Sequence, residues 1–387
     1  YSWSGGLGTA ATATPPTTVA GTTTYTLTVR DANGIAATDT ADVVVSLQPV
    51  AGTLTGSQEI CAATTPADIT LTGYTGTIVR WERSINTGFA NPAFIPSTSA
   101  TLSGALIGTN LASTRYVRAV VQNGTCPVVY SNYIEIKISA TTWDGTWSNG
   151  EPTATTAVIF NADFTATEDM AACTVVVNTG ANVVIPAGFN MTVDGAVTIN
   201  GGTFTVENNA NLVQVRNVNN SGEIDVIKDS APIYRLDYTL WSSPVDGQTL
   251  KAFSPQTLNN RFYTYNPVTN GYTQVSDPVT TEFIEGKSYL IRVDNTHPSF
   301  VNTSTPGTPW TGTFTGVPHN GNVDVAVTPG FNAVGNPYPS SLNIADFYAA
   351  NSGNLAQDAS LFFWRKKNDT NASSYASLTL AGYIAND

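Results

Sequence analysis

The chain contains 387 residues with a formal net charge of −12, and only 11% of them are charged, compared with about 25% in ordinary soluble domains. The negative charge opposes binding to phosphate backbones and anionic lipids, and no apolar run reaches the roughly 18 residues that a spanning helix requires. We therefore predict neither a nucleic-acid partner nor membrane insertion. The 32 glycines and 21 prolines, together with many threonines, favour strands and turns, so the predicted fold class is all-β.

The first predicted module, residues 1–47, ends in a β-hairpin. Apolar side chains alternate over Tyr25–Val29, residues 31–34 have turn composition, and Val43–Val45 continues the return strand. We interpret this as the closing hairpin of a small sandwich that begins before Tyr1. Asp31 is a candidate calcium ligand, but hydrogen bonding within its own turn is the favoured interpretation.

A second predicted module, residues 48–140, contains Cys61, Trp81 and Cys126 in the order found in immunoglobulin-type sandwiches. We predict that Trp81 is a core residue, with stacking on a glycan as the alternative. Both cysteines fall within this module, so we predict a Cys61–Cys126 disulfide, which implies an oxidising compartment. Cys173 is predicted to be a small buried hydrophobic residue, because its neighbourhood lacks the cations that activate a thiol.

The third predicted part, residues 141–230, is a repetitive β block. Between Val175 and Gln214, short apolar runs recur about every seven or eight residues and are separated by turns rich in Gly and Asn. This periodicity predicts a β-solenoid in which each turn buries its face against the next. We expect it to act as a spacer. Trp143 and Trp147 precede the repeat, either as a platform for sugar rings or, in the favoured interpretation, as a cap over its open end.

The fourth predicted part, residues 231–387, is an aromatic-rich β domain. Alternation over Phe262–Tyr265 and Tyr289–Arg292 predicts strands. One short helix is predicted over Ile344–Ala350, because Asn343 is a good N-cap and a glycine follows its end.

The last part also contains a proline-rich turn and a basic run. The prolines of Asn336–Pro339 predict a rigid turn that leads into the helix. Tyr338 in this turn is either a packed structural residue, which is the favoured interpretation, or an exposed binding aromatic. The basic run Arg365–Lys367 is predicted to lie at a solvated hairpin tip.

Few residues of the chain suggest catalysis. The two histidines, His297 and His319, have no cysteine or acidic cluster at metal-ligand spacing. The segment 286–288 echoes the end of a phosphate-binding loop but lacks its first glycine and a following helix. The carboxylates of Asp277, Glu282, Glu285 and Asp346 are not placed together by any pattern. We therefore predict no enzymatic activity, no bound metal and no cofactor.

The order of motifs resembles that of secreted, multi-domain cell-surface proteins of Bacteroidetes. The motifs are WDGTWSNGEPT, ENNANLVQ, DYTLWSSPV, RFYTYN, GKSYLIR, FTGVPHNG, AVGNPYPSSLNIADFYAANSG and LFFWRKKN. The first two modules resemble PKD-like and Ig-like repeats of bacterial surface proteins. The resemblance implies an extracellular location and export by the type IX secretion machinery through a sorting domain beyond Asp387. It also makes Thr40 and Ser230, in Asp-Thr-Ala and Asp-Ser-Ala tripeptides, candidate O-glycosylation sites.

The leading hypothesis is therefore a non-catalytic adhesin, spacer or filament component whose partners are other surface or filament domains. Filament subunits of this kind would join through exposed strand edges. The alternative is a glycan-binding accessory region of a larger secreted enzyme, in which Trp143, Trp147 or Tyr338 stacks on a polysaccharide.

Overall fold

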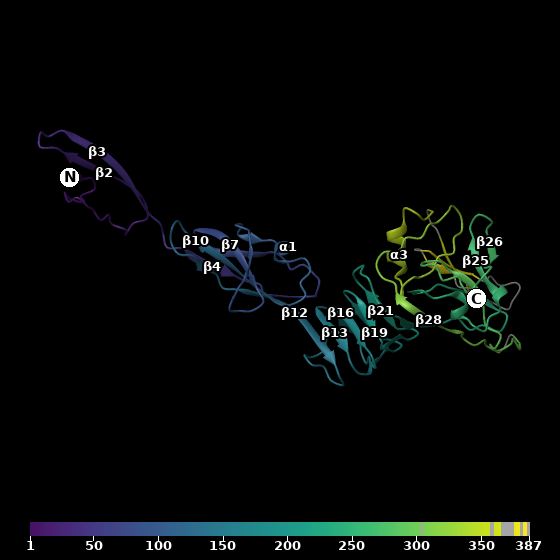
Figure 1. The fold of residues 1–387 in the computed structure, drawn as a ribbon. Coiled ribbons are helices and arrows are strands. Elements are labelled where there is room, and N and C mark those ends of the chain that lie inside the picture. Colours follow the sequence, from purple (N-terminus) through teal and green to yellow (C-terminus); the bar gives the residue numbers. More distant parts are fainter. Residues whose placement is uncertain (303–304, 357–359, 365–374, 380–381, 385–387) are drawn as a thin grey trace. The chain divides into compact units, whose positions relative to one another are not determined.

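The computed structural model describes residues 1–302, 305–356, 360–364, 375–379 and 382–384 (Figure 1). The chain divides into two compact units, residues 1–138 and 139–387. Strands account for 43% of the structure and helices for 5%, and of the three α-helices in the described residues only α3 is longer than one turn. The all-β prediction is thus confirmed. The finer division into four modules stays a prediction.

The first unit contains a three-stranded sheet, in the order β1-β2-β3, and a two-sheet module. The elements are β1 (Ser2–Trp3), β2 (Gly21–Arg30), β3 (Ala36–Val45), β4 (Val50–Leu54), β5 (Gln58–Ile60), β6 (Ile69–Thr75), β7 (Thr77–Ser84), β8 (Ala93–Ile95), β9 (Thr101–Leu102), α1 (Gly104–Ile107), β10 (Arg115–Gln122), β11 (Val129–Tyr130) and β12 (Ile134–Trp143). The division between the units falls within β12, whose residues 134–136 pair with β10 and whose residues 139–143 pair with β13.

The predicted N-terminal hairpin is confirmed. Strands β2 and β3 pair in register from Gly21 opposite Val45 to Arg30 opposite Ala36. The Asp31 carboxylate accepts hydrogen bonds from the backbone N–H groups of Asn33, at 2.9 Å, and Ile35, at 2.8 Å. Asp31 therefore stabilises its own turn, as the favoured interpretation required.

The second module packs its two sheets around Trp81. This residue is fully buried, and its indole N–H donates to the backbone oxygen of Ser99 at 3.1 Å. Strands β7, β8, β10 and β11 form one sheet with the first part of β12, and β4, β6 and β9 form the other. The assignment of Trp81 to the core is confirmed.

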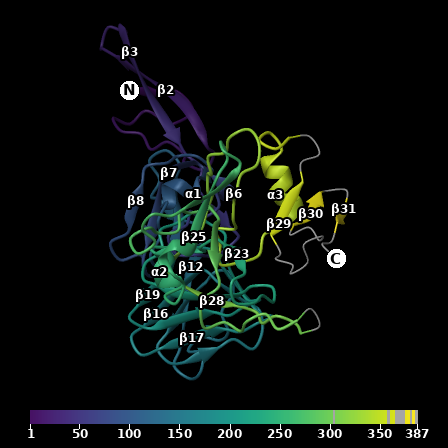
Figure 2. The same ribbon diagram turned by 90° about the vertical axis from the view of Figure 1, so that its right-hand side faces the viewer.

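The second unit begins with the predicted β-solenoid. Its strands are β13 (Thr156–Phe160), β14 (Phe164–Thr165), β15 (Met170–Ala172), β16 (Thr174–Asn178), β17 (Asn182–Ile185), β18 (Asn190–Val193), β19 (Val197–Asn200), β20 (Thr203–Val206), β21 (Asn211–Gln214) and β22 (Ile224–Asp229). They form three parallel ladders, β13-β16-β19, β14-β17-β20-β22 and β15-β18-β21. Each apolar run of the sequence is thus one side of a three-sided coil of about four turns (Figures 1 and 2).

The interior of the solenoid is a stack of equivalent apolar residues. On one side Val183 pairs with Phe204 and Ile185 with Val206, and on another Met191 pairs with Leu212. All of these side chains are at most 1% exposed. Because the ladders are parallel and in register, each inward side chain packs against its equivalent one turn away.

Polar side chains also stack from turn to turn on the outside of the coil. The Asn190 amide lies 3.1 Å from both carboxylate oxygens of Asp169, and the Asn211 amide donates to the Asn190 side-chain oxygen at 2.6 Å. Asn190 and Asn211 are 21 residues apart, which is the length of one turn. Thr203 and Asn182 form an equivalent pair at the same spacing, at 2.6 Å. These polar ladders hold the register at the corners.

The remainder of the second unit is an antiparallel β domain. Its elements are β23 (Tyr238–Trp241), β24 (Val245–Asp246), α2 (Leu250–Phe253), the 3-10 helix η1 (Asn259–Arg261), β25 (Phe262–Asn266), β26 (Gly271–Gln274), β27 (Tyr289–Arg292), β28 (Thr311–Pro318), α3 (Ile344–Asn351), β29 (Leu361–Trp364), β30 (Tyr375–Thr379) and β31 (Gly382–Ile384). The solenoid and this domain share one core cluster, which includes Phe204, Trp241, Phe253 and Phe314.

Two features of this domain were expected from the sequence. The predicted helix is confirmed as α3, and its N-cap Asn343 accepts from the N–H groups of Ala345 and Asp346. The strands predicted at Phe262–Tyr265 and Tyr289–Arg292 are β25 and β27. The one-turn helices α1 and α2 were not predicted. Residues 365–367, the predicted basic tip, lie outside the described residues.

Replacing Phe204 by alanine should lower the free energy of unfolding by about 3–5 kcal/mol, because it opens a cavity in the middle of the stack. Thr205→Ala is the matched control, since this neighbouring side chain points outward and is half-buried. Urea denaturation followed by circular dichroism measures both variants. Equal stability of the two would contradict the inward assignment of Phe204.

Asn190→Asp should destabilise the solenoid at neutral pH by about 1 kcal/mol, because it places a second carboxylate beside Asp169 at a solvent-accessible corner. Repulsion raises the pKa of the introduced carboxyl in the folded state, so the loss should grow as pH rises from about 3 to 7. Urea denaturation across this range tests it. Asn266→Asp is the control, because the Asn266 side-chain oxygen only accepts hydrogen bonds, from Val268 and Thr269. A pH-independent difference would refute the Asp169–Asn190 contact.

Candidate functional site

The two tryptophans that precede the repeat pack at the first turn of the solenoid. The Trp143 and Trp147 ring centroids are 5.0 Å apart, and Trp143 lies 5.1 Å from Phe164 in an edge-on arrangement. Trp147 also contacts Phe160, and both tryptophans pack against the buried core. The Trp143 indole N–H donates to the backbone oxygen of Asp163 at 2.9 Å. This is the arrangement expected of a cap. Glycan stacking by these residues stays a prediction.

The Asn336–Pro339 turn also lies against the solenoid, at its last turn. The Pro339 backbone oxygen accepts from the Leu212 N–H at 2.9 Å, and the Ser341 N–H donates to the Asn211 side chain at 2.8 Å. The turn therefore continues the ladder β15-β18-β21 with backbone that is far away in sequence. The sequence predicted its rigidity but not this contact.

Tyr338 in this turn is half-buried and held at both ends. Its hydroxyl donates to the backbone oxygen of Gly321 at 2.6 Å, and its N–H donates to the Asn336 side chain at 3.0 Å. Burial, followed by the negative charge of Glu285, raises the pKa of the Tyr338 phenol. These contacts favour the structural interpretation, and its stacking on a polysaccharide stays a prediction.

The predicted Cys61–Cys126 disulfide is wrong. Cys126 is a free thiol in the turn after β10, where its N–H donates to the Asn123 oxygen and its Sγ lies 3.8 Å from the Leu47 oxygen. The disulfide-bonded cysteines are Cys61 and Cys173. Cys173 is fully buried, as predicted, but it is oxidised. Sequence separation reveals nothing about the direction of each Cβ, and that direction decides which cysteines can be bridged.

The two candidate glycosylation sites differ in their surroundings. Thr40 is exposed in β3. Ser230 is half-buried at the end of β22, where its hydroxyl donates to the Ala231 oxygen at 2.7 Å and accepts from the Trp310 N–H at 2.9 Å. Of the two positions, Thr40 is the more accessible. Modification of either residue stays a prediction.

Three of the titratable side chains considered for catalysis, those of His297, His319 and Asp277, mainly contact backbone and hydroxyl groups. The Nε2 atom of His297 lies 3.0 Å from two backbone oxygens, and the Nδ1 atom of His319 lies 3.1 Å from the Pro337 oxygen and 3.8 Å from the Glu285 carboxylate. Asp277 accepts from Thr280 and Val279, and these bonds lower the pKa of its carboxyl. Among the described residues there is no group of three metal-ligating side chains.

An ionic cluster in the second module was not anticipated. Glu82 is 2% exposed and binds Arg80 at 2.7 Å and Arg118 at 2.8 Å. The Arg118 guanidinium also lies 4.1 Å from the Phe89 ring centroid and 4.0 Å from that of Tyr130. The alternation of Arg80 and Glu82 on one strand was the available signal. The cluster orders the outside of the β7–β10 sheet.

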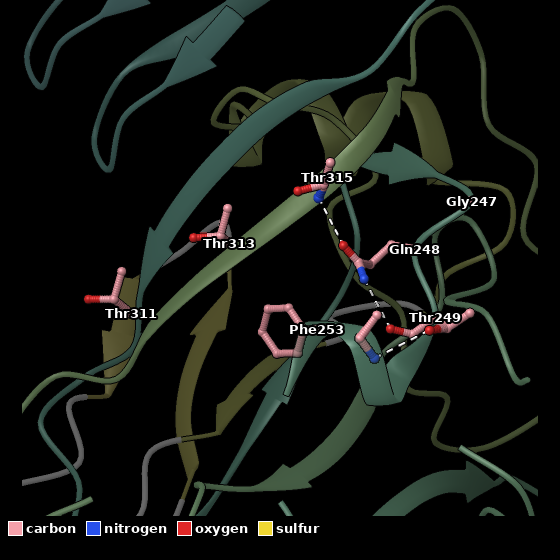
Figure 3. A pocket seen from close by; sticks show the side chains of 8 residues that line it. Gly247, Gln248, Thr249, Phe253, Thr311, Thr313 and Thr315 are labelled. Atoms are coloured by element: carbon pink, nitrogen blue, oxygen red, sulfur yellow. Dashed lines mark hydrogen bonds between the residues drawn. The ribbon is translucent and has the colours of Figure 1, made fainter. Parts of the chain in front are cut away.

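A concave site with a volume of about 600 Å³ lies beside β28. Thr311, Thr313 and Thr315 are spaced along the strand, and Gln248 and Phe253 form part of the opposite wall (Figure 3). The Thr315 N–H donates to the Gln248 side-chain oxygen at 2.8 Å. Its walls are hydroxyls, backbone and one aromatic ring, which is a composition suited to binding a polar chain. We regard this site as the candidate functional site.

The fold and this site define the class: an all-β protein in which a three-sided β-solenoid is continued by an aromatic-rich antiparallel domain. A family model described as Domain of unknown function (DUF8693) matches residues 138–387, and the chain belongs to this family. A second model, Domain of unknown function (DUF8696), matches residues 50–140. Comparisons with curated proteins and with solved structures returned no significant match. In the described part of the chain, none of the helices has the length and apolarity needed to span a bilayer.

Treatment of the unreduced native protein with a maleimide should modify one thiol, that of Cys126, because the other two cysteines are oxidised. Peptide mapping by mass spectrometry identifies the labelled residue, and Cys126→Ser should remove all labelling. Labelling of Cys173 instead of Cys126 would support the Cys61–Cys126 disulfide that the sequence predicted and would contradict the structure.

Proposed function

We propose that this chain is a non-catalytic segment of an extracellular surface protein and serves as a stiff spacer that presents adhesive or filament-forming domains. The observation that carries the proposal is the solenoid, which combines a continuous apolar interior with external polar ladders such as Asp169–Asn190–Asn211. Such a stack resists bending, because every turn is held to the next by ladder hydrogen bonds and side-chain packing. We also propose that export follows the type IX route, through a sorting domain outside this segment.

The surface location has independent support. Disulfides persist in oxidising compartments, and Cys61 and Cys173 are both oxidised. Only 16 residues of the chain are lysine or arginine, which leaves few sites for proteases that cut at basic residues. The motif order from Trp143 onward resembles that of secreted Bacteroidetes surface proteins. These observations together favour an extracellular location over a cytoplasmic one.

A deletion of one whole turn tests the spacer proposal. Removing residues 182–202 takes out β17, β18 and β19 and joins β16 to β20 in the same register, because Asn182 pairs with Thr203. A spacer should then be shorter by about 4.8 Å and otherwise intact. In cells that produce the full-length protein, we expect antibody labelling of intact cells and attachment to surfaces to match the natural chain.

The matched control deletes residues 182–191, which is about half a turn and therefore places strands of one turn against corners of the next. This variant should be degraded and should not be displayed. Two outcomes would count against the proposal: the natural protein recovered only with the cytoplasm, or loss of attachment after the whole-turn deletion although the variant is displayed normally.

A further inference from the structure

Strand β28 is paired along one side only over most of its length. On that side it forms an antiparallel ladder with β22, from Ile224 opposite Gly316 to Asp229 opposite Thr311. On the other side only Val317 and Pro318 pair with a strand, the short β24. The chain then turns away at Gly247, and the groove of the candidate site opens where β24 would have continued.

The backbone groups that face this groove can be identified from the ladder. Residues of an antiparallel strand alternately face one neighbour and the other. The Thr315 N–H faces the groove, because it donates to Gln248, and Trp310 faces β22, because its oxygen accepts from the Ser230 N–H. Thr311 and Thr313 therefore face the groove as well. Their N–H and C=O groups have no hydrogen-bond partner in the described parts of the chain.

Gln248 shows how the edge can be occupied. Its side-chain oxygen takes the position that a backbone oxygen of an added strand would take opposite Thr315. Together with β24, it completes the edge as far as Thr315 and leaves the edge unpaired at Thr313 and Thr311 (Figure 3). An unpaired, exposed edge of this kind is a template for another extended chain.

We propose that the β28 edge binds a short, basic, extended segment of another protein, which adds as a strand antiparallel to β28 beside Thr311 and Thr313. A strand added in this direction would continue the antiparallel pairing that β24 makes on the same edge. The proposal goes beyond a spacer role, because it assigns a peptide-binding site that a spacer does not require.

The charge of the ligand follows from the residues beside the threonines. The Thr315 and Thr311 hydroxyls donate to the Asp225 and Asp229 carboxylates at 2.6 Å each, and Asp246 is exposed at the end of β24. Lys228 projects from the opposite face of β22 by strand alternation. A second copy of this chain would bring a like net charge of −12, which disfavours self-association. Long basic side chains on the threonine face of the added strand would extend across β28 toward these carboxylates on β22, roughly 10 Å away.

The other face of the added strand must carry small residues. The Phe253 ring covers Gly312 so closely that a Cβ placed on this glycine would lie 2.5 Å from the ring. Phe253 and Ala252 line the groove on this side. The site therefore selects a pattern in which Lys or Arg alternates with Gly, Ala or Ser.

An array of synthetic heptapeptides in which Lys or Arg alternates with Gly, Ala or Ser tests the proposal. A matched control array carries Glu in place of the basic residues. Basic members should bind, and Thr313→Pro should weaken them by at least about tenfold, because it removes an edge N–H. Thr313→Val, which keeps the backbone N–H and replaces the hydroxyl with a methyl group, is the control and should bind as the natural chain does.

N-methylation of alternate peptide residues should abolish binding to the natural protein, which keeps the test decisive if Thr313→Pro fails to fold. The proposal is overturned if no peptide binds at concentrations up to about 1 mM, if acidic peptides bind equally well, or if methylated peptides bind unchanged. Concentration-dependent dimerisation that Thr313→Pro abolishes would also overturn it, in favour of a second copy of the chain.

Discussion

The second unit depends on one constraint, the alignment of residues one turn apart in the solenoid. A parallel ladder in register brings equivalent positions of successive turns together. The inward residues must therefore be apolar, and the corner residues must be able to hydrogen-bond to the equivalent side chain one turn away. Val183 and Phe204 satisfy the first condition, and Asn190 and Asn211 satisfy the second. A shift of one residue would expose the first pair and bury the second, so packing and polar contacts enforce the same register.

The two ends of such a coil present a problem that the middle does not have, because each terminal turn lacks a neighbour. At the first turn, Trp143 and Trp147 cover the ring of Phe164. At the last turn each side is covered differently: β28 pairs antiparallel with β22, and Pro339 takes a ladder hydrogen bond from Leu212. Because β28 covers the last turn, the unpaired edge is now the outer edge of β28. Strand β24 and the Gln248 side chain pair with only part of that edge.

The features that could be predicted from the sequence are those set by neighbouring residues. The spacing of seven or eight residues between apolar runs predicted the solenoid, alternation around Tyr25 predicted the hairpin, and Asn343 predicted the start of the helix. The contacts that could not be predicted join residues far apart in the chain. Asp225 and Thr315 are 90 residues apart, and Asn211 and Ser341 are 130 apart. The cysteine pairing failed for a similar reason, because a local pattern carries no information on the direction of Cβ. The groove beside β28 has no sequence signature of its own, since T-G-T-F-T reads as an ordinary half-buried strand.

The antiparallel closure of β22 by β28 also has a consequence for the order in which the protein acquires its structure. Strands β13 to β22 are contiguous in the chain, and each can pair as soon as the previous turn is complete. Strand β28 begins at Thr311, well after β22 ends at Asp229. During synthesis from the N-terminus, the coil would therefore complete its last turn with β22 uncovered until the later strand arrives. Over that interval the growing chain exposes the unpaired edge of β22. A chaperone or slow translation would help to prevent this edge from pairing with another molecule.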